Sequence, residues 1–257
     1  MKKLMIIFWA ICHIFIISGC APQSARQSVS NGEVSNVIYI EIPREPGNKE
    51  TGTEKLPEGF IYLTDVMPDV ILEIRYYSTY NFIGTRIDGY LAPAAIITRE
   101  AAEALSRASI ELKAKGYIIK IFDAYRPHGA VEHFIRWAKD TDDTLMKEYF
   151  YPDLEKDRLF PERYLGVRSA HSRGSTFDLT IVSMKTGMEA DMGSPYDFFG
   201  PVSHHGSKLV TKEQEDSRLI LKTAMENAGF RAYPQEWWHY TLNNEPYPAT
   251  YFSFPVK

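Results

Sequence analysis

The chain has 257 residues, of which 44% are hydrophobic and 24% are charged, and its formal net charge is −4. No block of basic residues stands out, so the composition argues against nucleic acid as a partner. The two cysteines, Cys12 and Cys20, both fall within the first twenty residues, so the rest of the chain offers no thiol for a disulfide, for catalysis or for a cysteine-ligated zinc site.

Residues 1–20 are predicted to be a lipoprotein signal peptide. Two lysines precede an apolar run from Leu4 to Ile17, which is short for a membrane span, and small residues lead to Cys20. In this interpretation Cys20 carries the lipid and anchors the chain to the cell envelope, on the periplasmic side of the outer membrane if the organism is Gram-negative. An uncleaved membrane anchor is the alternative, and it also places the chain outside the cytoplasm.

Residues 21–56 are rich in Ser, Asn, Gly, Pro and Glu, which is typical of a flexible tether. The apolar patch at residues 37–40 could add an edge strand. The remaining residues, 57–257, have the length of a single domain, and no internal repeat or second linker interrupts them.

Hydrophobic periodicity within this domain predicts a mixture of strands and helices. We expect strands at 70–77, 117–122, 175–182 and 238–242, and helices at 98–115, 127–138, 142–149 and 212–227. The first helix is marked by Thr98 as an N-cap and by Gly116 after its last turn. The elements do not follow a strict βαβ rhythm, so we expect an α+β fold.

The stretch HSRGSTFD, residues 171–178, contains the first candidate metal ligands, His171 and Asp178. A histidine and an aspartate at this spacing also occur by chance, and the alternative is a tight turn that leads into a strand. With His239 they would give zinc two imidazoles and one carboxylate, and would leave a fourth position for water. Their occurrence together, in a domain without cysteine, favours the metal site.

Glu236 lies three residues before His239, in the sequence EWWH. The preceding Tyr233 and Pro234 argue against a helix, so a bend must bring the two side chains together. Zinc lowers the pKa of a bound water to about 7, and Glu236 could then accept its proton.

Arg126 follows the strand predicted at 117–122 and comes directly before Pro127. It could form a surface salt bridge with Asp123. It could also direct a fixed cation at the charge that develops on a tetrahedral intermediate. Composition does not decide between these interpretations.

Together these motifs resemble the VanX-type D-alanyl-D-alanine dipeptidases, zinc enzymes related to the D,D-carboxypeptidases of cell-wall metabolism. The likeness covers nearly all of residues 58–257. It rests on residues 123–127, 169–175 with Asp178, and 236–240, and on flanking segments at 81–84, 88–90, 245–248 and 254–257. The resemblance implies a single α+β domain of the hedgehog/D,D-peptidase type, with a mostly antiparallel central sheet and flanking helices.

The resemblance also assigns roles to residues. It implies one Zn²⁺ per chain held by His171, Asp178 and His239, with Glu236 as general base and Arg126 stabilising the transition state. Its implied dipeptide pocket consists of Tyr76, Ser169 and Asp197.

Each residue of the implied pocket has a structural alternative. Asp197 suits a free substrate ammonium, but it follows a proline-containing turn and could be a turn residue. Tyr76 could be a core aromatic residue and Ser169 a turn residue. Thr176 departs from the family, which usually has alanine at this position.

The implied function of residues 57–257 is zinc-dependent hydrolysis of the D-Ala-D-Ala dipeptide to D-alanine in the cell envelope. The sequence indicates membrane attachment through Cys20 and no protein partner. One alternative is a D,D-carboxypeptidase or peptidoglycan endopeptidase, which the envelope location favours and Asp197 opposes. Another is a non-catalytic zinc domain that binds cell-wall peptides, and the presence of Glu236 and Arg126 opposes it.

Overall fold

The computed structural model describes residues 55–257. The predicted signal peptide, nearly all of the predicted tether and the strand considered at 37–40 lie outside the described residues. Within the described part of the chain, no helix has both the length and the apolar character needed to cross a membrane.

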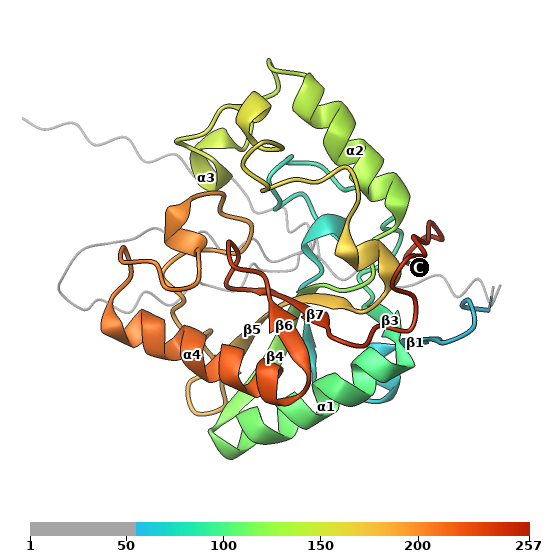
Figure 1. Ribbon diagram of the computed structural model, residues 1–257, viewed down its shortest axis with the longest axis vertical. Coiled ribbons are helices and arrows are strands. Elements are labelled where there is room, and N and C mark those ends of the chain that lie inside the picture. The colour runs from blue at the N-terminus through green and yellow to red at the C-terminus, as the bar shows by residue number, and fades with distance from the viewer. Residues whose placement is uncertain (1–54) are drawn as a thin grey trace, which may run out of the picture. The chain divides into compact units, whose positions relative to one another are not determined.

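A five-stranded sheet forms the centre of the domain (Figure 1). Its strands, in spatial order, are β2 (Ile71–Leu72), β4 (Tyr117–Asp123), β5 (Thr176–Ser183), β7 (His239–Leu242) and β6 (Phe230–Ala232). Only the pair β2–β4 is parallel, and the other three pairs are antiparallel. A separate antiparallel pair joins β1 (Phe60–Tyr62) to β3 (Ile96–Thr98). The predicted α+β fold with a mostly antiparallel sheet is confirmed.

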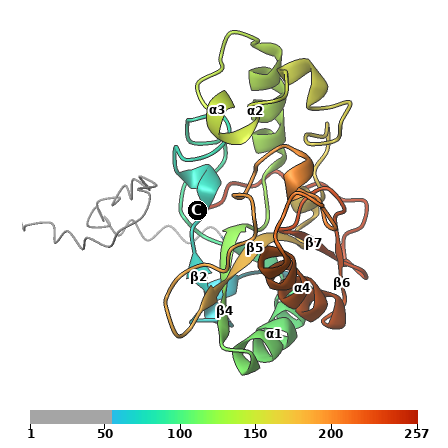
Figure 2. The ribbon, with the colours of Figure 1, turned by 90° about the vertical axis from the view of Figure 1, so that its left-hand side faces the viewer.

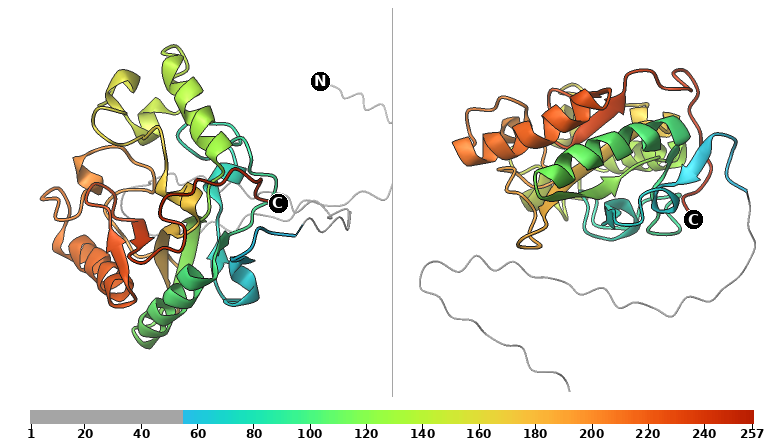
Figure 3. Two further views of the ribbon diagram at one scale, coloured as in Figure 1. Left: turned by 45° about the vertical axis from the view of Figure 1, so that its right-hand side comes forward. Right: turned by 90° about the horizontal axis from the view of Figure 1, so that it is seen from below.

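Two long helices, α1 (Arg99–Ala114) and α4 (Lys212–Asn227), lie side by side and pack against the sheet (Figures 2 and 3). The apolar stripe of α1, which includes Leu105 and Leu112, is fully buried. Thr211 begins α4 with a capping box, in which its side chain accepts from the backbone N–H of Gln214.

The helices α2 (His128–Lys139) and α3 (Lys147–Phe150) lie at the opposite end of the domain from α1 and α4 (Figures 1 and 2). Lys156 terminates α2, because its Nζ donates to the carbonyl oxygens of Trp137 (3.0 Å) and Asp140 (2.6 Å). Short 3₁₀ helices complete the domain at Leu63–Asp65, Arg75–Tyr77, Lys156–Arg158, Ala170–Arg173 and Pro201–Ser203.

The strand predicted at 70–77 is wrong in its second half, where a 3₁₀ turn follows β2 and carries Tyr76. Arg75 is buried in this turn, paired with Glu73 at 2.7 Å and stacked on Tyr80, and a continuous strand would point it differently. The helix predicted at 142–149 is limited to α3, because the side chains of Asp140 and Asp143 accept backbone N–H groups in local turns.

The C-terminal segment binds to the backbone around the site described below. The N–H of Phe252 donates to the carbonyl of Ser172 (2.8 Å), and the hydroxyl of Tyr125 donates to the carbonyl of Phe254 (2.8 Å). The N–H of Val256 donates to the carbonyl of Gly89 (2.8 Å). Three chain segments that are distant in sequence are thereby held together.

Candidate metal and active site

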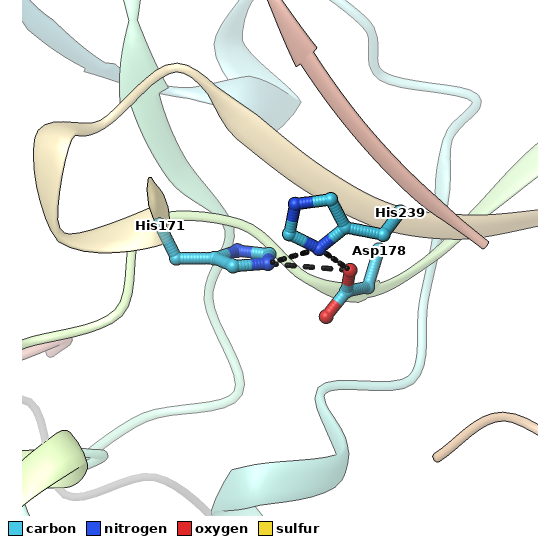
Figure 4. A group of neighbouring side chains, drawn as sticks. All are labelled: His171, Asp178 and His239. Atoms are coloured by element: carbon cyan, nitrogen blue, oxygen red, sulfur yellow. Dashed lines mark hydrogen bonds and ion pairs between the residues drawn. The ribbon is translucent and has the colours of Figure 1, made fainter. Parts of the chain in front are cut away.

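The register of the central sheet brings Asp178 and His239 together. They are directly paired residues of β5 and β7, so their side chains leave the sheet on the same face. His171 approaches from the 3₁₀ helix that precedes β5 (Figure 4). Oδ1 of Asp178 lies 3.2 Å from Nε2 of His171 and 3.0 Å from Nδ1 of His239, and the two nitrogens are 3.2 Å apart. Among the described residues, this is the only group of three side chains that could share a metal ion in this way.

The three side chains fit a divalent metal by their chemistry. Nδ1 of His171 lies 2.7 Å from the carbonyl oxygen of Ala124, which can only accept, so this nitrogen carries the proton and Nε2 keeps its lone pair. Oδ1 of Asp178 is buried and has no hydrogen-bond donor. Burial opposes ionisation of Asp178, yet the imidazoles of His171 and His239 hold the pKa of this carboxyl well below its usual range. Two imidazoles and a carboxylate form a donor set that zinc accepts.

Arg126 is largely buried, with 11% of its side chain exposed. Its Nε donates to Asp123 at 2.8 Å, so the predicted pair with Asp123 exists, but Asp123 is fully buried and the pair does not lie on the surface. Its Nη2 lies 3.3 Å from Oδ2 of Asp178, and its guanidinium lies over the ring of Tyr76. A fixed cation therefore stands beside the candidate metal ligands.

Two further side chains support this group, and sequence reasoning did not assign them to the site. The hydroxyl of Tyr90 donates to Oδ1 of Asp123 at 2.6 Å, and the hydroxyl of Tyr196 donates to Oδ2 of Asp178 at 3.1 Å. Tyr196 directly precedes the predicted site residue Asp197, and this position in the sequence could have indicated that Tyr196 lies near the site. Tyr90 lies in the flanking motif at 88–90, but nothing in that motif connects it to Asp123.

A bend brings Glu236 to the same place, as its position before His239 predicted. The N–H of His239 donates to the carbonyl of Glu236, and Oε2 of Glu236 lies 3.5 Å from Nδ1 of His239. Burial raises the pKa of Glu236 well above its usual range, and the nearby carboxylates of Asp178 and Asp197 raise it further. Such a carboxyl binds a proton more strongly than an exposed glutamate does.

A cavity of about 740 Å³ opens onto these groups. All eight residues predicted for the site line it, namely Tyr76, Arg126, Ser169, His171, Asp178, Asp197, Glu236 and His239. The hydroxyl of Tyr76 donates to Asp197 at 2.9 Å, and burial together with the charge of Asp178 raises the pKa of Asp197 to about 8. Ser169 caps the 3₁₀ helix of His171 by accepting its N–H at 3.3 Å.

Thr176 lies behind the candidate ligand His239. Its hydroxyl is 3.0 Å from that of Thr241, which in turn is 3.5 Å from Nε2 of His239. The hydroxyl that Thr176 has, and that alanine would lack, is therefore hydrogen-bonded to a second buried threonine. The pairing of β5 with β7 continues without a shift at this position.

The described domain matches known proteins over its whole length. A family profile described as "D-ala-D-ala dipeptidase" matches residues 57–257. The D-alanyl-D-alanine dipeptidase of Enterococcus faecalis is 41% identical over 202 residues, which cover 79% of this chain and 100% of that protein. The namesake of Streptomyces coelicolor is 37% identical, over 77% of this chain and 98% of that protein, and the one of Escherichia coli is 29% identical, over 74% and 86%. The chain therefore belongs to the D-Ala-D-Ala dipeptidase family of M15 metallopeptidases.

Proposed function

We propose that the chain hydrolyses the D-Ala-D-Ala dipeptide to two molecules of D-alanine, with one Zn²⁺ held by His171, Asp178 and His239. The observation that carries this proposal is the presence of the three candidate ligands, a carboxyl with a raised pKa and a largely buried arginine in one cavity. Membership of the dipeptidase family supports the same substrate.

Glu236 and Arg126 have separate roles in the proposed reaction. When bound, zinc supplies Lewis-acid chemistry, which makes a water more acidic and polarises a carbonyl group. Glu236 accepts the proton of the attacking water and delivers it to the amine nitrogen as the peptide C–N bond breaks. Arg126 faces the carbonyl oxygen, where negative charge develops as water adds to the carbon. The contact of Arg126 with Asp123, which Tyr90 also binds, fixes its guanidinium before substrate arrives.

The free dipeptide is favoured over longer peptides by Asp197. This carboxyl is buried within the cavity and has one hydrogen-bond donor, Tyr76. A substrate ammonium beside it would form a charge-assisted hydrogen bond, whereas a blocked amine would leave a buried acid without its partner.

The test compares two substrates in zinc-loaded protein. We expect release of D-alanine from D-Ala-D-Ala and much slower release from a muramyl pentapeptide. A Glu236→Ala variant should retain its metal but lose turnover by a factor on the order of 10²–10⁴, because it lacks the proton acceptor. Unchanged turnover in that variant would contradict the mechanism. Faster cleavage of the pentapeptide than of the dipeptide would show that the protein is a carboxypeptidase rather than a dipeptidase.

We also propose that Cys20 is lipidated, that residues 21–56 tether the domain, and that residues 57–257 work in the cell envelope. The support is the charged, apolar and small-residue pattern that ends at Cys20. Labelled palmitate should enter the full-length chain and should not enter a Cys20→Ser variant. Equal labelling of both would contradict the anchor.

A further inference from the structure

Three arginines besides Arg126 line the cavity, and they differ in how their charge is balanced. Arg231 donates to the carbonyl of Leu242 (2.8 Å) and pairs with Glu245 (3.1 Å). Arg163 and Arg168 are exposed, and neither forms an ion pair with a carboxylate within residues 55–257. Arg163 and Arg168 are therefore two cations of the cavity lining that no carboxylate of the described residues balances.

The backbone at Arg163 is held in an unfavourable conformation. Its φ is +66°, and the only other non-glycine residue with positive φ in the described part of the chain is Asp197, at +61°. Both residues line the same cavity. A left-handed conformation costs a residue such as arginine on the order of 1–3 kcal/mol and persists only where surrounding contacts impose it. The two strained residues are thus an arginine and an aspartic acid that line one site.

Hydrogen bonds fix the segment of Arg163 beside the catalytic bend. The hydroxyl of Tyr233 donates to the carbonyl of Arg163 (3.1 Å), and Nε2 of Gln235 donates to the carbonyl of Glu162 (3.1 Å). Gln235 directly precedes Glu236. The position of Arg163 at the cavity is therefore coupled to that of the proposed general base.

Arg168 is placed by chain connectivity and by an aromatic ring. It precedes His171 by three residues, so its backbone lies within about 11 Å of that candidate ligand. Its guanidinium lies 5.3 Å from the centre of the Tyr251 ring. A cation–π contact orients an arginine without neutralising its charge, so the guanidinium remains available to an anion.

We propose that Arg163 and Arg168 form a carboxylate clamp that binds the C-terminal carboxylate of the substrate. This inference rests on the proposed function and extends it to the leaving residue. A dipeptide is a zwitterion: with its ammonium at Asp197 and its peptide carbonyl at Arg126, its carboxylate needs a further cation, and Arg163 and Arg168 are the cations of the cavity lining that pair with no carboxylate of residues 55–257. Guanidinium groups suit this task, because they bind carboxylates through paired N–H donors. The clamp makes the protein selective for peptides with a free C-terminus.

The experiment compares each substrate with its C-terminal amide. Rates are measured on D-Ala-D-Ala and on D-Ala-D-alaninamide, and on a muramyl pentapeptide and its amide. The variants are Arg163→Gln, Arg168→Gln and the double variant, with Arg231→Gln as the matched control on the same cavity. The substituted side chains of the clamp are exposed, and melting temperatures verify that the variants remain folded.

We expect the wild-type protein to prefer the free carboxylate by a factor on the order of 10–100 in kcat/KM, as charge-assisted hydrogen bonds provide. Each single variant should lose part of that preference, mainly through KM, and the double variant should cleave acid and amide about equally. Arg231→Gln should keep the wild-type preference. The amide substrate, which the clamp cannot recognise, should be cleaved equally well by the wild-type protein and all four variants.

The outcomes separate the clamp from the proposed function. A double variant that still prefers the acid overturns the clamp and leaves the dipeptidase in place, as does a wild-type protein without any preference. If only the pentapeptide is cleaved, the dipeptidase function is overturned. The clamp is then tested by the rates on the pentapeptide and on its amide, because the pentapeptide, like D-Ala-D-Ala, ends in a free D-alanine carboxylate. Cleavage of neither substrate overturns both.

Discussion

Four carboxyl groups lie in or directly behind the cavity wall, three of them lining it, and each has different surroundings. Asp178 faces two imidazoles, which hold its pKa well below the usual range. Burial raises the pKa of Asp197 to about 8 and raises that of Glu236 well above its usual range. Asp123 is paired with Arg126. Environments that separate the proton affinities of neighbouring acids are typical of sites that use them as ligand, binder and base.

At this scale, Asp197→Asn is expected to weaken binding of substrates with a free amine. Asparagine tolerates the left-handed backbone at this position, so the variant removes the charge and keeps the loop. Loss of a charge-assisted hydrogen bond should raise KM for D-Ala-D-Ala by a factor on the order of 10–100, with a smaller change in kcat. Steady-state kinetics measure both.

The control for that variant is Asp191→Asn, which changes an exposed aspartate of the same loop that contacts Gln214. It should leave KM within about twofold. An Asp197→Asn protein with wild-type KM would remove Asp197 from substrate recognition.

At the scale of elements, strand register is what assembles the site. Asp123, Asp178 and His239 are paired across β4, β5 and β7, so they stand in a row on one face of the sheet. A slip of one residue in either pairing would send a side chain to the other face, where the helices pack. The relative positions of these three side chains therefore depend on the correct pairing of β4, β5 and β7.

Helix α4 supports the site through Arg218, a buried cation that contacts no carboxylate within residues 55–257. Its guanidinium donates to the carbonyls of Met192 (2.6 Å), Val202 (2.9 Å) and His204 (3.0 Å), which flank Asp197 in the chain. Arg218→Met should lower the free energy of unfolding by roughly 2–4 kcal/mol, because buried carbonyls lose their donors. Urea denaturation measures this loss.

Lys212→Met, an exposed substitution on the same helix, serves as the comparison and should change stability by less than about 0.5 kcal/mol. Equal stabilities of the Arg218 and Lys212 variants would show that Arg218 does not hold the loop.

Much of this architecture could be predicted where local pattern and tertiary structure agree. The helix predicted at 212–227 has those bounds in α4, and the strand at 175–182 differs from β5 by one residue at each end. Periodicity and turn residues mark both elements locally. The sequence motifs likewise predicted the residues that line the cavity, because each motif contributes its own side chain.

Other features depend on contacts that no local pattern reveals. The 3₁₀ turn at Tyr76 forms because Arg75 is buried and pairs with Glu73. The first part of the helix predicted at 142–149 is replaced by turns in which aspartate side chains accept backbone N–H groups. The Tyr90–Asp123 hydrogen bond joins residues 33 positions apart. Arg163 gave no signal in the sequence, because its importance lies in its backbone conformation and its unbalanced charge.

Over the whole molecule, a large aromatic core stabilises the described domain, which has no cysteine to form a disulfide. Phe82 alone makes ring contacts with Tyr76, Phe134, Trp137 and Phe199, all of them buried. Aromatic side chains bury 150–250 Å² each and contribute further through edge-to-face packing. These contacts join α2 to the segments that carry Tyr76 and Asp197, so the core also supports one wall of the cavity.

The stability of the domain should depend on pH through His205. Burial, and then the charges of Lys222 and Arg218, lower the pKa of His205 to about 4 in the fold, against about 6.5 when unfolded. Between these values the unfolded chain binds a proton that the folded chain does not, so stability falls as the pH decreases from 6.5 to 4. His205→Gln should reduce this loss by on the order of 2–3 kcal/mol.

Urea denaturation at pH 7 and at pH 4, for the wild-type protein and the variant, gives this difference directly. The neutral ring of His205 packs near Tyr240, so the variant is also less stable at pH 7, and only the change between the two pH values is compared. Parallel losses in both proteins would mean that His205 is not the group responsible.

The proposed function requires that His171, Asp178 and His239 hold one metal ion and that Glu236 accepts the proton of the attacking water. The most direct test is the metal content of purified, zinc-equilibrated protein, measured by plasma mass spectrometry for the wild type, Glu236→Ala and His239→Ala. We expect about one zinc per chain in the first two proteins and a loss of bound zinc in the third. A wild-type protein without metal, or a His239→Ala variant that retains a full equivalent, would contradict the proposed function.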